Sequence, residues 1–307
     1  MVDLDQLLER TSRTFALNIP LLPEPTRREV TVAYLLFRIA DTFEDSVLWP
    51  RERRIRALAD FQGLLADPAT PDRTSLVVEW IREPPLRHEG YVQLLGETPL
   101  VLDAFSRLAA EARESIRHHV GRTAEGMSGF VARSDADGHL RLKGLQELRD
   151  YCYVVAGIVG EMLTVLFLCG REHLGEVAPR LRDWAPVFGE GLQLTNILKD
   201  VTTDLDEGRR YLPEGVDRAE VFDLAHRDLD AATEYTLALQ DAGAERGLVA
   251  FNALPVALAR ATLDRLEARG PGSKLSRPEL WSIVSSVRKA LDKGRPPLQR
   301  RAPDPVA

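Results

Sequence analysis

The sequence predicts an all-α protein that folds as a single helical bundle. Apolar residues recur at helical spacing along nearly the whole chain, and no run of strict alternation indicates a β-strand. Loops rich in proline, glycine and aspartate separate the periodic segments. The expected helices span residues 24–48, 51–67, 73–83, 99–133, 144–171, 174–207, 217–243, 246–269 and 277–293. We expect one domain over residues 1–293, and the prolines and charges of residues 294–307 predict a disordered tail.

Composition excludes several classes of protein. The formal net charge of -7 argues against a nucleic-acid partner, which would favour a basic stripe. The two cysteines, Cys152 and Cys169, fit a reducing cytoplasm, and the histidines and cysteines show no zinc-binding spacing. No secretory signal is evident at the N-terminus. The longest apolar stretch, residues 153–170, is interrupted by Glu161, which favours a buried core helix over a transmembrane segment. We expect a cytoplasmic protein, with peripheral membrane contact as an alternative, and the oligomeric state stays open.

A first acidic face lies in the segment from Tyr34 to Asp45. At 100° per residue, Tyr34, Arg38, Asp41 and Asp45 fall within an arc of about 60°. Asp41 and Asp45 stand four residues apart, so their carboxylates project side by side and repel each other. A solvated polar surface is the simpler interpretation of one such helix.

A second acidic face follows the same pattern later in the chain. Gln193, Asn196, Asp200 and Asp204 are spaced by three, four and four residues and share an arc of about 80°. Two such faces, pointing at one another, would form a pocket of four carboxylates. Magnesium suits that pocket because it prefers oxygen ligands and usually combines few carboxylates with substrate phosphates. Basic residues nearby would neutralise a diphosphate: these are Arg38, Lys199 and Arg209.

Six segments together resemble the squalene/phytoene synthase family. They are SRTFALNIPLLP (12–23), AYLLFRIADTFED (33–45), GMSGFV (126–131), YCYVVAGIVGEML (151–163), QLTNILKDVTTDLDEGRRYLP (193–213) and FNALPVALARATL (251–263). They cover about 250 residues in the family's order, and the fifth is highly specific. The DT-x-ED form of the first acidic motif leans toward the squalene branch. The resemblance implies an isoprenoid-synthase-type bundle with a central apolar cavity.

The resemblance also implies a role for each matching residue. Asp41 and Asp45 would hold magnesium, or manganese, at one diphosphate, and Asp200 and Asp204 would do so at the other. Asn196 and Gln193 would complete the shell of metal ligands at this second diphosphate. The residues expected to bind or activate the substrates are Arg13, Phe15, Tyr34, Arg38, Tyr151, Val155, Gly157, Lys199, Arg209 and Tyr211. Lys199 stands where most members have arginine, which keeps the charge but loses the planar fork of donors.

The family's chemistry leaves the product open. Two prenyl diphosphates, with farnesyl diphosphate as the expected substrate, would condense head to head through a cyclopropyl diphosphate. Hydride from NADPH would then give squalene, whereas proton loss without NADPH would give phytoene or dehydrosqualene. Lys274 and Arg277 loosely resemble a basic pair associated with NADPH, and ordinary surface charge is the alternative. Further rivals are a non-enzymatic family member, a head-to-tail elongase and a terpene cyclase. Retention of all four aspartates argues against the first of these.

Overall fold

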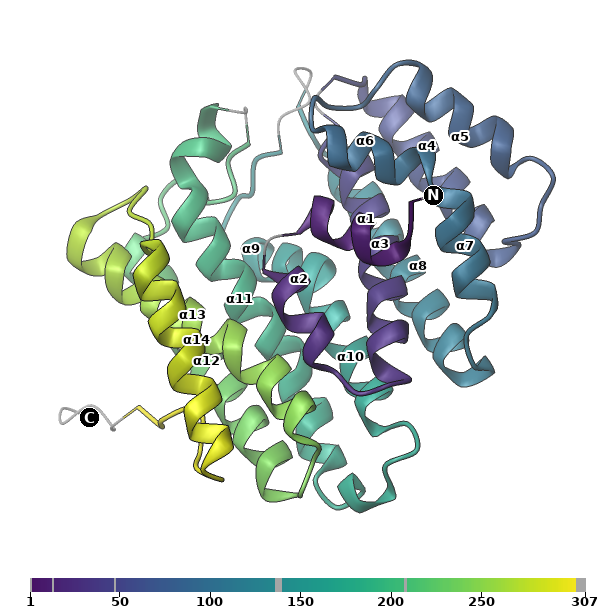
Figure 1. The fold of residues 1–307 in the computed structure, drawn as a ribbon. Helices are drawn as coiled ribbons and strands as arrows, with labels where there is room; N and C mark the ends of the chain where they lie inside the picture. The colour runs from purple at the N-terminus through teal and green to yellow at the C-terminus, as the bar shows by residue number, and fades with distance from the viewer. Residues whose placement is uncertain (1, 13, 47, 136–139, 207–208, 302–307) are drawn as a thin grey trace. The chain divides into compact units, whose positions relative to one another are not determined.

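The computed structural model describes residues 2–12, 14–46, 48–135, 140–206 and 209–301, and these residues are predominantly helical (Figure 1). Within these ranges no β-strand forms, and the backbones of Arg141 and Arg210 pair in an isolated β-bridge. The predicted all-α class is therefore confirmed.

The chain divides into two compact units that interleave along the sequence. Unit 1 comprises residues 1–20, 24–141 and 206–210, and unit 2 comprises residues 21–23, 142–205 and 211–307. One of the crossings, between Leu205 and Asp206, lies inside the last turn of a helix. A flexible linker is therefore absent at that crossing, which explains why the sequence suggested a single domain.

Unit 1 is built around a central buried helix, α3. Its helices are α1 (Leu4–Thr11), α2 (Phe15–Asn18), α3 (Thr26–Glu44), α4 (Arg51–Ala66), α5 (Arg73–Arg82), α6 (Glu89–Gly96), α7 (Thr98–Ser106) and α8 (Ala110–Ala132), and the turn η1 (Ile19–Leu21) follows α2. Helix α3 packs against α1, α4, α6, α7 and α8. Because so many helices surround it, nearly all of its side chains are buried.

Three features of unit 1 differ from the predicted helices. Helix α1 begins at a capping box formed by Asp3 and Gln6. This helix was not predicted, because its 8 residues are too few for a clear periodic pattern. Helix α6 begins within a stretch that was expected to be a loop. The segment 99–133 was predicted as one helix, yet the chain turns at residues 107–109 between α7 and α8. That turn contains neither glycine nor proline, so no breaker residue indicates it.

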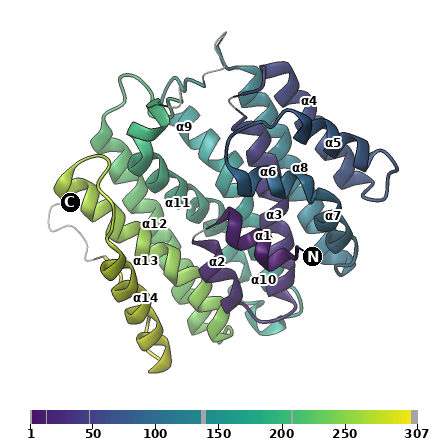
Figure 2. The ribbon, with the colours of Figure 1, turned by 45° about the horizontal axis from the view of Figure 1, so that its top comes forward.

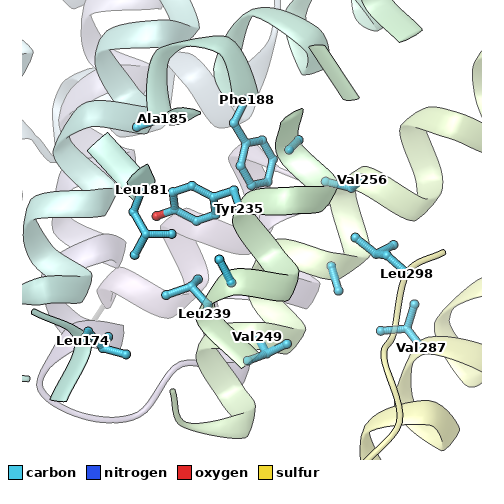
Figure 3. Packing of buried hydrophobic residues seen from close by; sticks show 13 residues of the cluster. Leu174, Leu181, Ala185, Phe188, Tyr235, Leu239, Val249, Val256, Val287 and Leu298 are labelled. Carbon is cyan, nitrogen blue, oxygen red and sulfur yellow. The ribbon is translucent and has the colours of Figure 1, made fainter. Parts of the chain in front are cut away.

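Within its described residues, unit 2 contains six α-helices and two short helical turns. They are α9 (Leu145–Cys152), η2 (Tyr153–Gly157), α10 (Ile158–Leu168), η3 (Glu172–Leu174), α11 (Ala178–Asp206), α12 (Arg218–Asp241), α13 (Arg246–Arg269) and α14 (Arg277–Asp292). Helix α13 packs against both α12 and α14, and Figure 2 shows α13 next to each of them. Tyr235 lies at the centre of this unit's core, with Phe188 edge-on to its ring (Figure 3). Its hydroxyl group is paired with Thr164 at 2.9 Å, so the buried polar atom is satisfied.

The segment that follows α14 contacts the core of unit 2 over part of the range that was expected to be a disordered tail. Leu298 is buried in the same cluster as Val287 (Figure 3). Arg260 donates a hydrogen bond to the Gln299 carbonyl at 2.6 Å, and Arg300 pairs with Glu234 at 2.7 Å. One apolar anchor and these polar contacts order residues 295–300 despite their prolines. Residues 302–307 lie outside the described residues.

One helical stretch, Leu145–Leu168, is long and apolar enough by composition to cross a membrane. It spans α9, η2 and α10, and 44% of its apolar window is buried inside the protein. Leu148, Met162 and Phe167 contribute to that burial. This is weak evidence for membrane insertion, because core helices of globular proteins share these properties.

Candidate functional site

The first acidic face forms on α3 as the helical spacing predicts. From Glu29 to Ser46, the positions that keep partial exposure are Tyr34, Arg38, Asp41 and Asp45, and every other residue is buried. The intervening apolar residues, Leu35, Leu36, Ile39 and Phe43, have no exposed surface. The stripe is therefore a narrow polar seam on an otherwise buried helix, which is not the environment of an ordinary solvated face.

Each aspartate of the seam has an arginine partner. The Arg38 guanidinium lies 3.3 Å from an Asp41 oxygen, and Arg209 forms an ion pair with Asp45. Next to Arg209, the Arg210 N–H donates to the Leu140 carbonyl at 3.3 Å. These pairs offset the repulsion between carboxylates four residues apart on one helix.

Burial changes the protonation of this seam. Removal from water raises the pKa of Asp41 to about 6, against the opposing effect of Arg38 and with a further increase from Asp45. Burial and the nearby Asp45 raise the pKa of Glu44 to about 8, although Arg54 opposes the shift. Sequence reasoning missed Glu44, because it lies off the stripe and only burial makes it unusual. Burial therefore favours the neutral form of both Asp41 on the seam and Glu44 beside it.

Aromatic rings flank the seam. Tyr34 donates its hydroxyl proton to the Thr11 carbonyl at 2.9 Å, and its ring lies 5.4 Å from that of Phe15. The predicted residues Phe15, Tyr34 and Arg38 are thus brought together in unit 1. Arg13, which was also predicted to bind substrate, lies outside the described residues.

The second acidic face forms on α11 in unit 2. Gln193, Lys199, Asp200 and Asp204 are partly exposed and Asn196 is exposed, whereas Leu194 and Ile197 are buried. The Lys199 ammonium group donates to the Asn196 side-chain oxygen at 3.1 Å and lies 3.2 Å from an Asp200 oxygen. Lys199 therefore offsets the charge of Asp200 as an arginine would, with a single point charge. Leu205, next to Asp204 near the end of the helix, is 47% exposed.

Two predicted tyrosines stack in unit 2. The rings of Tyr151 and Tyr211 are 4.9 Å apart and inclined by 25°, and both residues are buried. On the same helix as Tyr151, Arg149 pairs with Glu190 of α11 at 2.7 Å and so connects α9 to α11. Glu190 was not predicted, because a lone acidic residue within an apolar run carries no motif.

Val155 and Gly157 lie in a π-helical turn rather than in a regular helix. The Ile158 N–H donates to the Tyr153 carbonyl, five residues back. A Cβ atom on Gly157 would lie 2.7 Å from the Tyr153 ring and 3.3 Å from the Pro186 carbonyl oxygen. Turns of this kind are frequent at functional sites because they redirect side chains within a helix. Helical periodicity alone did not predict it.

The residues fit a metal ion that binds together with a diphosphate. Among the described residues, no group of three or more histidine, cysteine, aspartate or glutamate side chains is arranged to hold a metal. Magnesium, however, commonly takes one or two carboxylates and completes its shell with waters and substrate phosphates. Asp41 with Asp45, and Asp200 with Asp204, each supply such a pair on one helix face. These pairs alone supply too few ligands to hold a metal ion without waters or substrate phosphates.

Comparison with known proteins gives a consistent result. A family model described as squalene/phytoene synthase matches residues 8–282. The Botryococcus squalene synthase of Botryococcus braunii is 32% identical over 202 residues, which cover 66% of this chain and 39% of that protein. The squalene synthase of Schizosaccharomyces pombe is 28% identical over 211 residues, covering 69% and 44%. The chain thus matches less than half the length of these relatives.

Solved structures agree with the fold. A complex of TcSQS with the ligand E5700 aligns with a TM-score of 0.71 and 25% identity, covering 95% of this chain and 88% of that one. A dehydrosqualene synthase complex aligns with a TM-score of 0.56 at 18% identity, covering 94% and 95%, and at that identity it supports the fold alone.

Proposed function

Because this chain belongs to the squalene/phytoene synthase family, whose members are prenyltransferase-type enzymes, we propose that it condenses two prenyl diphosphates head to head in the presence of magnesium. The observation that carries the proposal is the pairing of acidic and basic residues on both faces. Asp41 and Asp45 lie beside Arg38 and Arg209, and Asp200 lies beside Lys199. Carboxylates suit a divalent cation, and the basic groups suit the phosphate oxygens that accompany it.

Each face has a defined task in this proposal. Magnesium, when bound, supplies positive charge that stabilises the departing diphosphate. Arg38 and Arg209 donate N–H groups to oxygens of one diphosphate, and Lys199 does so at the other. Arginine offers a planar pair of donors and lysine a single charge, so the two diphosphates are held with different geometric precision.

The buried tyrosines serve the hydrocarbon part of the reaction. After ionisation, the allylic cation must reach the second substrate's double bond before water does. The stacked rings of Tyr151 and Tyr211 present electron-rich surfaces that stabilise a cation without attacking it. Val155 and Gly157, in the π-helical turn, provide apolar surface for a prenyl tail. Condensation would pass through a cyclopropyl diphosphate, and squalene is the proposed product when NADPH delivers hydride.

Product analysis by mass spectrometry tests the proposal. The full chain is incubated with farnesyl diphosphate or its C20 homologue and magnesium, with and without NADPH. A C30 hydrocarbon formed only with NADPH supports a squalene synthase. A C40 or dehydro-C30 product without NADPH assigns the chain to the phytoene or dehydrosqualene branch of the same chemistry.

A matched variant links the product to the first acidic face. Asp41→Asn keeps the size of the side chain and removes its charge, so turnover should fall by at least about 100-fold. The substitution Asp60→Asn on α4 serves as the control, because Asp60 is a partly exposed aspartate outside both faces. If the parent forms neither product nor cyclopropyl intermediate, a non-enzymatic role replaces the proposal.

A further inference from the structure

Helix α6 places an aromatic ring against the arginine of the first acidic face. The guanidinium carbon of Arg38 lies 5.3 Å from the centre of the Tyr91 ring and 5.6 Å from the centre of the Tyr34 ring. Both distances are within the range in which a ring face attracts a cation. Arg38 therefore contacts two aromatic rings, one from its own helix and one from α6.

These two contacts belong to a longer series of contacts between planar groups. On one side, the His88 ring lies 4.0 Å from the Tyr91 ring and is inclined to it by 24°. On the other side, the Phe15 ring lies 5.4 Å from the Tyr34 ring. The order is His88, Tyr91, Arg38, Tyr34 and Phe15, so Arg38 is the central member. A guanidinium that contacts two rings and an aspartate has few alternative rotamers.

The position of Tyr91 is fixed by contacts that do not involve Arg38. Gly90 packs so closely on α1 that an added Cβ would lie 2.4 Å from the Arg10 carbonyl oxygen. The Arg10 side chain donates to the Gln93 oxygen at 2.6 Å. The Tyr91 N–H donates to the Nδ1 atom of His88, which caps the helix at 3.3 Å. Tyr91 is thus placed before any ligand arrives.

Arg38 needs this support because its polar groups are incompletely satisfied. Its Nε atom is buried and makes no hydrogen bond to any described residue. Burial alone would lower the pKa of Arg38, but Asp41 and the neighbouring tyrosines outweigh it and the pKa is raised. A guanidinium is weakly hydrated and stacks well on rings, so aromatic faces suit it better than an aliphatic pocket.

We propose that Tyr91 is a positioning residue that holds the Arg38 guanidinium for diphosphate binding. This inference rests on the proposed function, in which Arg38 binds a diphosphate. Tyr91 acts through its ring face and not through its hydroxyl group, since the attraction to a cation is a property of the ring. The ligand class is a diphosphate with its magnesium, and Tyr91 itself need not contact it.

The test measures binding of magnesium pyrophosphate by calorimetry. Tyr91→Leu removes the ring and should weaken binding by roughly 5- to 30-fold, the range expected for a desolvated cation–ring contact. Tyr91→Phe keeps the ring and should stay within about 3-fold of the parent. In an Arg38→Met background, Tyr91→Leu should have no further effect, because the partner of the ring is gone. Trp281→Leu, which removes an exposed ring on α14, is the control for loss of an aromatic residue.

A second series keeps the inference testable if Tyr91→Leu does not fold. Replacement of Tyr91 by phenylalanine with one, two, three or five ring fluorines keeps the shape and progressively weakens the negative face of the ring. Binding should fall step by step along this series, and KM should rise more than kcat falls. Equal binding across the series, with a parent that binds normally and forms product, overturns the inference and leaves the proposed function standing. A parent that does not bind pyrophosphate overturns both.

Discussion

Asp228 offers a stability test that does not depend on any substrate. It lies on α12, is 5% exposed, and its Oδ2 atom makes no hydrogen bond within the described residues. Burial, followed by the nearby Glu190 carboxylate, raises the pKa of Asp228 from its ordinary value of 3.8 to about 7. Arg149 opposes the shift but is already paired with Glu190. Above neutral pH the folded protein must therefore bury an extra charge.

The sign of the effect follows from proton binding. Between pH 3.8 and about 7 the folded state binds more protons at this site than the unfolded state, so stability falls as the pH rises. A shift of about three units corresponds to about 4 kcal/mol as an upper limit. Asp228→Asn is neutral at every pH and its amide can donate to Glu190. We expect this variant to exceed the parent by about 1 to 4 kcal/mol at pH 8.5.

Urea unfolding at several pH values measures the difference. The advantage of Asp228→Asn should shrink steadily between pH 8.5 and pH 5. Asp223→Asn is the control, because Asp223 is exposed on the same helix and should show no such trend. If the difference in unfolding free energy between Asp228→Asn and the parent were the same at every pH, the reasoning would be refuted. A change in packing alone does not alter the number of protons bound on folding, so it would give such a constant difference.

Three further substitutions have expected outcomes. Asp200→Asn should reduce turnover by at least about 100-fold with little loss of thermal stability, because it removes a proposed metal ligand from a partly exposed position; activity and melting temperature measured together check this. Gly160→Ala should destabilise the fold by more than about 2 kcal/mol in urea unfolding, since its Cβ would lie 2.1 Å from the Ala185 carbonyl oxygen. The control Gly63→Ala, with open space around it, should be neutral or stabilising. Leu298→Ala should cost about 2 to 4 kcal/mol, and an unchanged urea midpoint would mean that the final segment does not anchor the core.

Periodicity and spacing predicted the parts of the site that lie on regular helices. The seam on α3 is visible in the sequence because Tyr34, Arg38, Asp41 and Asp45 interrupt an apolar helix at turns of three and four residues. The family motifs, once matched, identified Tyr151 and Tyr211 as well. Such features depend on the spacing of residues that are close together in the sequence, and a sequence pattern records that spacing directly.

Features that depend on tertiary contact were not predictable in this way. Helix α6 was taken for a loop because Pro84, Pro85 and Gly90 are breaker residues, yet Gly90 is required there for close packing on α1. Tyr91 was missed with it. Glu44 and Asp228 resemble ordinary acidic residues until their burial is known. Leu298 is a single apolar residue among prolines and arginines, too little to indicate packing from the sequence alone.

The ion pairs of the two faces imply how metal and diphosphate depend on each other. Asp41, Asp45 and Asp200 are already neutralised by Arg38, Arg209 and Lys199. A magnesium ion alone would displace these basic groups and leave them without a counter-charge. A diphosphate alone would take the basic groups and leave the carboxylates repelling each other. If both bound together, these carboxylates would pair with the metal and the basic groups with the phosphate oxygens, so each group of these three ion pairs would again have a partner. The proposed chemistry therefore requires the metal and the diphosphate to bind cooperatively, with the ion pairs as the resting arrangement.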